Sequence, residues 1–376
     1  MSPIRLTLRS FILGLLYSIY ILAMATLIGE VFLRYAFTPE ALKTRIQSNR
    51  LAKDPDQIQE SLFELSEMKF RSNSTGKILH QEYNVSASHD RFGFRNPCFN
   101  FNKPVSEIIL GDSFVYGVGL NDFDTLGCHL KKEKPDINVY TMGVPGANPV
   151  NYLQILEKNK KSTERLIGGK KRISVMIFVG NDYESLISLG DGAKTKTSSR
   201  QNIIHNTLES INFYFVKSKW LSESYFFQAL KIAYIRIFKP NETKNYFINY
   251  AGSTFYKAGT ALDTSIIVSS INKIKEKIEA VGYAFDSFYL IPDPADVSES
   301  RLSRDSMLGQ FTPGEIDVNH KFNSLINACN QAQLSCIDFR PLLSETDYYI
   351  QDNHLRVSGI KKISKEIAHK NLIKQK

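Results

Sequence analysis

Residues 105–114 read VSEIILGDSF, a short apolar run that ends in a glycine, an aspartate and a serine. A run of this length is typical of a strand buried in a parallel sheet. Four similar runs follow at 137–142, 173–179, 284–291 and 335–339. Helical patterns separate or follow them at 124–132, 151–165, 264–280, 319–331 and 358–370. This alternation predicts a doubly wound, flavodoxin-like sheet of five parallel strands in a three-layer α/β/α domain.

The residues after the expected strands carry groups that acyl transfer requires. Ser113 follows the first strand, Gly146 lies in the turn after the second, and Asn181 follows the third. Asp352 and His354 share one loop after the fifth. The carboxyl ends of parallel strands meet at one edge of a sheet, where ligands bind. Each residue alone is also an ordinary cap or turn residue. Together they predict a serine nucleophile, an imidazole base and a carboxylate that orients it.

The order of these motifs resembles that of the SGNH hydrolases, also called GDSL-like esterases, over about residues 91–370. Four motifs carry the resemblance: LGDSFVYG at 110–117, Gly146, Gly180-Asn181-Asp182, and Asp352 with His354. The resemblance implies that Ser113 is the nucleophile and that Asp352 and His354 support it. It also implies an oxyanion hole made by the backbone N–H groups of Ser113 and Gly146 and the side-chain amide of Asn181. It implies no cofactor and no metal.

One departure from the family pattern concerns the last motif. The commonest family motif places the aspartate three residues before the histidine, where this chain has Gln351, whereas Asp352 is two residues before His354. This spacing resembles that of membrane-anchored relatives that modify surface polysaccharides. Phe92-Gly93-Phe94-Arg95, ahead of the first motif, is similar to the same relatives.

An uncharged segment near the N-terminus predicts a membrane anchor. Residues 10–29 contain no charged side chain, and as a helix of about 1.5 Å per residue they span the roughly 30 Å of bilayer hydrocarbon. Arg5 and Arg9 precede the segment, which favours a cytoplasmic N-terminus at 1–9 and a periplasmic or other extracytoplasmic main domain. Ala23-Met24-Ala25 leaves a cleaved signal peptide as the alternative.

The rest of the chain divides by its local patterns. Residues 30–90 are expected to form a stalk or linker, and residues 91–376 the catalytic domain. Residues 190–262 are an aromatic-rich helical insertion after the third strand. Its aromatic side chains suit a subdomain core, a lid that binds sugar rings, or a surface that dips into the membrane.

Composition excludes several classes of protein. The 376 residues are 43% hydrophobic, as in a globular protein, and 47 Lys and Arg against 38 Asp and Glu give a net charge of +9. The basic residues form no zinc finger or basic arm, so a nucleic acid is not an expected partner. Cys98, Cys128, Cys329 and Cys336 lack the CxxC spacing of metal or redox sites. Four is an even number that an oxidising compartment could pair into disulfides, with a connectivity that the sequence leaves open.

Three functions remain compatible with these motifs. The first is an esterase that removes an acyl group from an O-acylated extracytoplasmic glycan or lipid-linked saccharide. The second is an O-acetyltransferase of surface polysaccharide, in which a sugar hydroxyl takes the acyl group from the serine and a membrane acyl-donor protein is a partner. The third is a non-catalytic scaffold of envelope glycan assembly.

Overall fold

The computed structural model shows a chain that forms two compact units. One consists of Met1–Asp54 with Lys196–Pro240, and the other of Pro55–Thr195 with Asn241–Lys376. The structure describes residues 3–36, 63–64, 66–166, 168, 171–190, 224–227, 229–230, 247–250, 253–260, 264–309 and 312–373.

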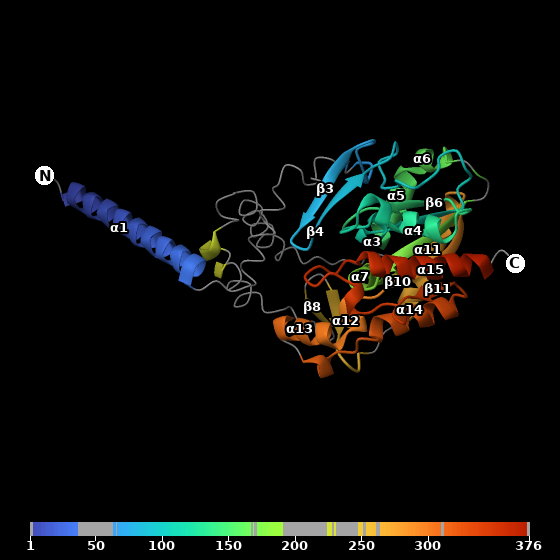
Figure 1. Ribbon diagram of the computed structural model, residues 1–376. Helices are drawn as coiled ribbons and strands as arrows, with labels where there is room; N and C mark the ends of the chain where they lie inside the picture. Colours follow the sequence, from blue (N-terminus) through green and yellow to red (C-terminus); the bar gives the residue numbers. More distant parts are fainter. Residues whose placement is uncertain are drawn as a thin grey trace. The chain divides into compact units, whose positions relative to one another are not determined.

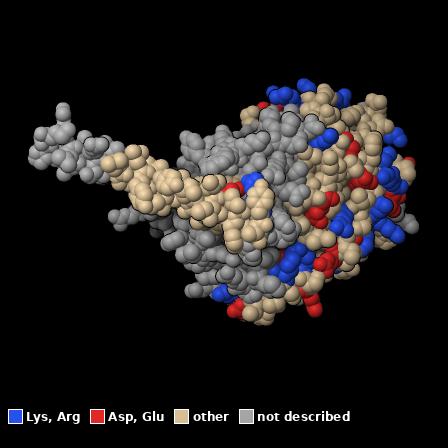
Figure 2. Space-filling view, turned by 60° about the vertical axis from the view of Figure 1, so that its left-hand side comes forward, with Lys and Arg blue, Asp and Glu red and all other residues tan. Residues whose placement is uncertain are grey.

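The first unit is built on one long N-terminal helix. Helix α1 spans Pro3–Val31 and continues into a π-helical turn at Phe32–Ala36. Its stretch Leu13–Ala36 is long and apolar enough to cross a membrane. The helix, drawn tan in Figure 2, bears only uncharged side chains from Leu13 to Gly29. These observations agree with the expected apolar segment at 10–29.

The C-terminal end of helix α1 is hydrogen bonded to a short segment of the insertion at 224–227. The Glu30 carboxylate accepts hydrogen bonds from Ser224 Oγ at 2.7 Å and from the backbone N–H of Phe226 at 2.9 Å. Arg34 pairs with the same carboxylate at 2.7 Å. The charged residue that ends the apolar segment is therefore satisfied within its own unit.

The second unit contains a five-stranded parallel sheet in the order β6-β5-β7-β10-β11 (Figure 1). In chain order the strands are β5 (Glu107–Gly111), β6 (Val139–Gly143), β7 (Arg172–Phe178), β10 (Ala284–Ile291) and β11 (Cys336–Asp338). Numbered one to five along the chain, they lie in the order 2-1-3-4-5, which is the flavodoxin-like order. The predicted fold class is confirmed.

Helices and short turns connect these strands. The helices are α3 (Ser113–Tyr116), α4 (Leu126–Glu133), α5 (Pro149–Lys158), α6 (Lys160–Glu164), α7 (Asp182–Gly190), α11 (Thr264–Ala280), α12 (Pro294–Val297), α13 (Glu299–Gly309), α14 (His320–Gln331) and α15 (Val357–Ile373). Within the described residues, 3-10 turns lie at Asp122–Asp124, Pro313–Glu315 and Glu345–Asp347. The single helix expected at 151–165 is two helices, α5 and α6.

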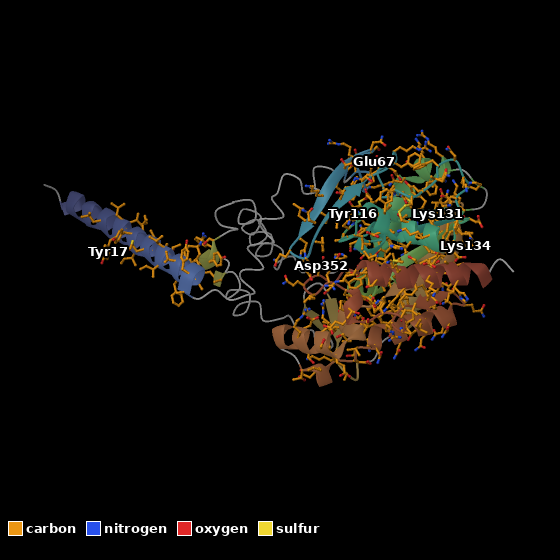
Figure 3. All side chains as sticks on the ribbon, in the orientation of Figure 1. Tyr17, Glu67, Tyr116, Lys131, Lys134 and Asp352 are labelled. Carbon is orange, nitrogen blue, oxygen red and sulfur yellow. A yellow bond between two sulfur atoms is a disulfide. The ribbon has the colours of Figure 1, made fainter. Side chains whose placement is uncertain are left out.

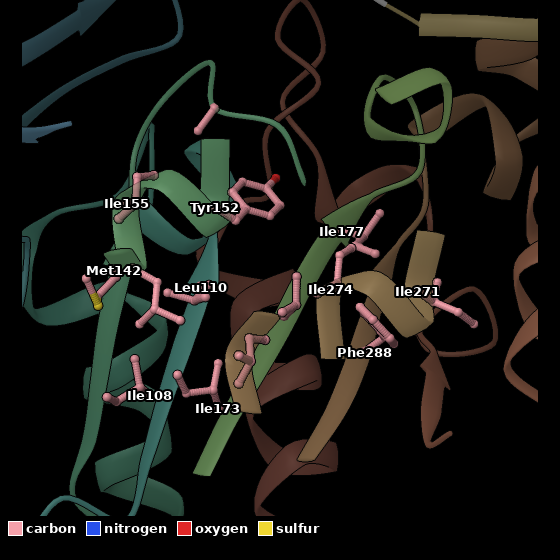
Figure 4. Packing of buried hydrophobic residues seen from close by; sticks show 14 of the residues in the cluster. Ile108, Leu110, Met142, Tyr152, Ile155, Ile173, Ile177, Ile271, Ile274 and Phe288 are labelled. Carbon is pink, nitrogen blue, oxygen red and sulfur yellow. The ribbon is translucent and has the colours of Figure 1, made fainter. Parts of the chain in front are cut away.

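The core lies on both faces of the sheet because neighbouring strand residues point to opposite sides. Ile108 and Leu110 pack with α5, α7, α11 and α14, in the cluster shown in Figure 4. Ile109, between them, packs with α3, α4 and α15 on the other face. All three are fully buried. Burial of each such side chain stabilises the fold by about 1.5–3 kcal/mol, which explains the unbroken apolar runs in the sequence.

Antiparallel strands precede the sheet. Strands β3 (Thr75–His80) and β4 (Tyr83–Ser88) form a hairpin, and a smaller pair joins β1 (Phe63–Glu64) to β2 (Lys69–Phe70). Phe70 and Ala87 pack with Tyr116 of α3 in one buried cluster. The described residues of the expected stalk at 30–90, from Phe63 onward, lie in the second compact unit. Buried contacts between the hairpin and α3 give the physical reason.

The insertion at 190–262 lies mainly outside the described residues. Its described part includes an antiparallel hairpin of β8 (Phe247–Tyr250) and β9 (Ser253–Tyr256), which the expectation of a helical insertion did not include. Phe255 and Tyr256 are buried in the second unit. At least these aromatic side chains serve as core, whereas most of the proposed lid is outside the described residues.

The four cysteines form two disulfides, Cys98–Cys128 and Cys329–Cys336. The first joins the segment before β5 to helix α4. The second joins helix α14 to strand β11. The sequence alone left this pairing open.

Candidate active site

Ser113 lies at a tight junction between strand β5 and helix α3. The strand ends at Gly111, Asp112 caps the helix, and Ser113 is its first residue. The Asp112 carboxylate accepts the Phe114 N–H at 2.9 Å, which satisfies one of the free donors at the helix start. A Cβ at Gly143, at the end of neighbouring β6, would overlap the backbone of α3. Glycine at that position therefore lets the end of β6 approach the backbone of helix α3, whose first residue is the half-buried Ser113.

Asp352 and His354 are in direct contact, as their spacing predicted. The distance from His354 Nδ1 to Asp352 Oδ1 is 2.5 Å, and the His354 backbone N–H donates to the same oxygen at 3.2 Å. The hydroxyl of Tyr83 donates to Asp352 Oδ2. Burial by itself would raise the pKa of Asp352, but the bond from His354, the charge of His354 and the Tyr83 hydroxyl lower it to about 2. The carboxylate is therefore ionised at neutral pH, and Nδ1 carries the proton of the shared bond.

The imidazole lies against the segment that carries Ser113. Its ring centroid is 5.2 Å from that of Phe114, the residue after Ser113. Burial raises the pKa of Asp112, the residue before Ser113, and the nearby charge of His354 opposes that rise. Within the described residues no hydrogen bond joins the Ser113 hydroxyl to the imidazole, whose Nδ1 is bonded to Asp352.

Gly146 and Asn181 lie after the two strands that flank β5. The sheet order places β6 and β7 on either side of β5, so the turns that carry both residues adjoin the Ser113 junction. Gly146 is exposed and has φ +76°, a backbone conformation that favours glycine. Asn181 is also exposed, and its backbone N–H donates to the Phe178 carbonyl at 3.3 Å. Among the described residues no hydrogen bond joins Gly146 or Asn181 to Ser113, and their role in binding an oxyanion stays a prediction.

Two buried acidic residues lie beneath this edge of the sheet. Asp182 begins α7, and its Oδ2 accepts the Tyr152 hydroxyl at 2.6 Å and the Phe178 N–H at 3.2 Å. Burial, with the nearby charge of Asp112, raises the pKa of Asp182 well above its usual value. Burial likewise raises the pKa of Asp112 to about 6. The sequence interpretation treated Asp182 only as part of a turn, but its bonds fix the start of α7 directly after Asn181.

Sequence reasoning missed the residues that hold the loop carrying Asp352 and His354. Glu82 and Tyr83 come from the β3–β4 hairpin, and Arg301 comes from α13. Figure 3 shows Asp352 beside one end of this hairpin. The only sequence signal of Glu82 and Tyr83 is a polar turn between two short strands, and such a turn does not indicate which residues it contacts. Arg301 lies in a helix and has no such signal.

Metal binding finds no support in the described part of the chain. Among those residues, no group of three or more His, Cys, Asp or Glu side chains is arranged to hold an ion. The acidic and histidine side chains of the candidate site are instead engaged with one another and with backbone N–H groups.

No protein-family model matches this sequence, and no curated protein matches it. Solved structures do match. A member of the lipolytic protein G-D-S-L family from Veillonella parvula is 10% identical, with a TM-score of 0.36 over 71% of this chain and 97% of that chain. Est24, a carbohydrate acetylesterase from Sinorhizobium meliloti, is 9% identical, with a TM-score of 0.36 over 72% of this chain and 99% of that chain. Similarity at this level does not identify an activity, so the function argued below rests on the site itself.

Proposed function

We propose that this protein is a serine-dependent acyl-ester hydrolase. The observation that carries the proposal is the 2.5 Å contact between Asp352 Oδ1 and His354 Nδ1. The imidazole of His354 lies against the segment that bears Ser113. Because Asp352 is ionised and holds the proton at Nδ1, the neutral imidazole has Nε2 available as a base. This is the arrangement that activates a serine hydroxyl.

The reaction proceeds in two halves. Ser113 Oγ attacks the ester carbonyl carbon while its proton passes to His354 Nε2. The tetrahedral intermediate then expels the alcohol, which takes that proton, and leaves an acyl group on Ser113. In the second half His354 Nε2 takes a proton from a water molecule, which attacks the acyl-enzyme carbonyl. The second tetrahedral intermediate then expels Ser113 Oγ, which takes that proton back from His354, and the acid is released. The Ser113 hydroxyl must first turn toward the imidazole, and catalytic hydrogen bonds often tighten only when substrate binds.

The oxyanion of each intermediate requires hydrogen-bond donors. We assign the backbone N–H groups of Ser113 and Gly146 and the side-chain amide of Asn181 to this role. The support is that all three lie after adjacent strands β5, β6 and β7, and that Gly146 and Asn181 are exposed and so accessible to a ligand. Removal of one such donor typically reduces kcat by about 10²- to 10³-fold.

The proposed substrate is an O-acylated glycan or lipid-linked saccharide outside the cytoplasm. Helix α1 supplies the proposed single-pass anchor in the cytoplasmic membrane, with Arg5 and Arg9 on the cytoplasmic side. Two disulfides are consistent with an oxidising compartment for the catalytic unit. An anchored esterase in that position meets surface glycans and their lipid-linked precursors. O-acetyl transfer to a sugar hydroxyl by the same residues is the outcome to distinguish by experiment.

The test uses full-length protein in detergent with p-nitrophenyl acetate and a fluorophosphonate probe. Wild-type turnover and probe labelling should both disappear in Ser113→Ala. They should persist in Ser188→Ala, which removes an exposed hydroxyl on helix α7. Addition of a chito-oligosaccharide as acceptor separates hydrolysis from transfer, since only a transferase yields acetylated sugar. Turnover that survives in Ser113→Ala would refute the proposal.

A further inference from the structure

The turn between strands β3 and β4 binds the loop that carries Asp352. Glu82, in this turn, has a carboxylate that accepts three successive backbone N–H groups. Oε1 accepts from Ile350 at 2.7 Å, and Oε2 accepts from Gln351 at 2.7 Å and from Asp352 at 3.0 Å. Such charge-assisted bonds are stronger than neutral ones. Because this part of the loop is outside helix and strand, the Glu82 carboxylate takes the place of a regular backbone partner.

Tyr83, the next residue, reaches the Asp352 side chain itself. Its hydroxyl donates to Oδ2, while Oδ1 receives the His354 Nδ1 proton at 2.5 Å. Both carboxylate oxygens are thus engaged, and rotation of the carboxylate would break both bonds. The Tyr83 ring also lies 4.8 Å from the ring of Tyr349. The side chain of Tyr83 is therefore held on the loop by packing as well as by its hydroxyl.

The opposite side of the loop is held by helix α13. Arg301 is only 2% exposed, and its guanidinium donates to the carbonyls of Tyr349 at 2.8 Å and Ile350 at 2.7 Å, and to Asn353 Oδ1 at 3.1 Å. Arg301 thus binds carbonyl groups, whereas Glu82 binds N–H groups. With both partners in place, the freedom left to Asp352 is the rotation of its own side chain, and Tyr83 restricts that rotation.

We propose that Tyr83 and Glu82 are positioning residues, which act through Asp352 to hold the His354 imidazole in the orientation that accepts the Ser113 proton. The inference rests on the proposed ester chemistry and adds a part to it from the hairpin that precedes the sheet. An imidazole displaced by about 1 Å can lose about 10²-fold in rate. Tyr83→Phe keeps the ring and removes only the hydroxyl, so it isolates the bond to Asp352.

The experiment measures kcat and KM for p-nitrophenyl acetate with full-length protein in detergent. Tyr83→Phe and Glu82→Ala should each lower kcat by about 10-fold or more, with KM within about twofold of wild type. Ser88→Ala is the matched control. The Ser88 hydroxyl also links this hairpin to the rest of its unit, but it donates to Asp122 Oδ2 at 2.6 Å and not to Asp352. Its kcat should stay within about twofold of wild type.

A double-mutant comparison separates positioning from a general loss of structure. In an Asp352→Ala background, Tyr83→Phe should change kcat by less than about twofold, because the group through which it acts is gone. A further tenfold loss there would overturn the assignment. If the wild type turns over the ester and Tyr83→Phe has the same kcat, the positioning role is refuted and the ester chemistry is not. Absence of Ser113-dependent turnover in the wild type would refute both the ester chemistry and this inference.

Discussion

Replacement of Asp112 by asparagine should change how the stability of this protein depends on pH. Asp112 is 2% exposed, and burial raises the pKa of its carboxyl from 3.8 to about 6. The folded protein therefore binds this proton more tightly than the unfolded chain between about pH 4 and pH 6. For this group the free energy of unfolding is highest at low pH, falls as the pH rises through that window, and stays lower above it.

The magnitude follows from the size of the pKa difference. A shift of about two units at about 1.4 kcal/mol per unit amounts to about 3 kcal/mol. Asparagine cannot ionise, yet it keeps an oxygen that can accept the Phe114 N–H bond at the start of α3. Relative to Asp112→Asn, the wild type should thus lose about 3 kcal/mol of unfolding free energy between about pH 4 and pH 7.

Urea unfolding followed by circular dichroism, in detergent at several pH values across that range, measures this difference. Asp136→Asn is the control for loss of one acidic residue, since Asp136 is exposed. Wild-type and Asp112→Asn stabilities that change in parallel with pH would refute the reasoning. So would a variant that becomes relatively less stable as the pH rises.

Two further predictions concern the strand ends around Ser113. Gly143→Ala should lower the unfolding free energy by about 2 kcal/mol or more in urea unfolding, because its Cβ would overlap the backbone of Tyr116. Gly127→Ala is its control: the added Cβ would be 3.7 Å from the nearest atom, so stability should not fall, and equal losses in both would contradict the packing argument. Asn181→Ala should lower kcat by about 10²- to 10³-fold without a change in the thermal midpoint, because Asn181 is exposed and its proposed role is oxyanion binding. An unchanged kcat for ester hydrolysis would remove Asn181 from the oxyanion hole.

The sequence by itself determined the sheet and the order of the strand-end motifs. Local patterns suffice there, because a strand buried on both faces needs an unbroken apolar run such as Ile108–Leu110. The contact between Asp352 and His354 was also predictable, since the two residues are adjacent on one short loop. The helix near the N-terminus was visible because length and absence of charge define it without any tertiary partner.

Only the tertiary structure decided which distant segments support the site. Glu82 and Asp352 are bonded although 270 positions separate them, and no local pattern records such a pairing. No local pattern records that the buried carboxyl groups of Asp112 and Asp182, which follow two different strands, are close enough for the charge of Asp112 to raise the pKa of Asp182. The sequence around the hairpin at 75–88 shows no strand periodicity of any length, and the sequence interpretation therefore included this segment in the stalk or linker at 30–90. Its role depends on what its turn touches, and chain folding alone determines that.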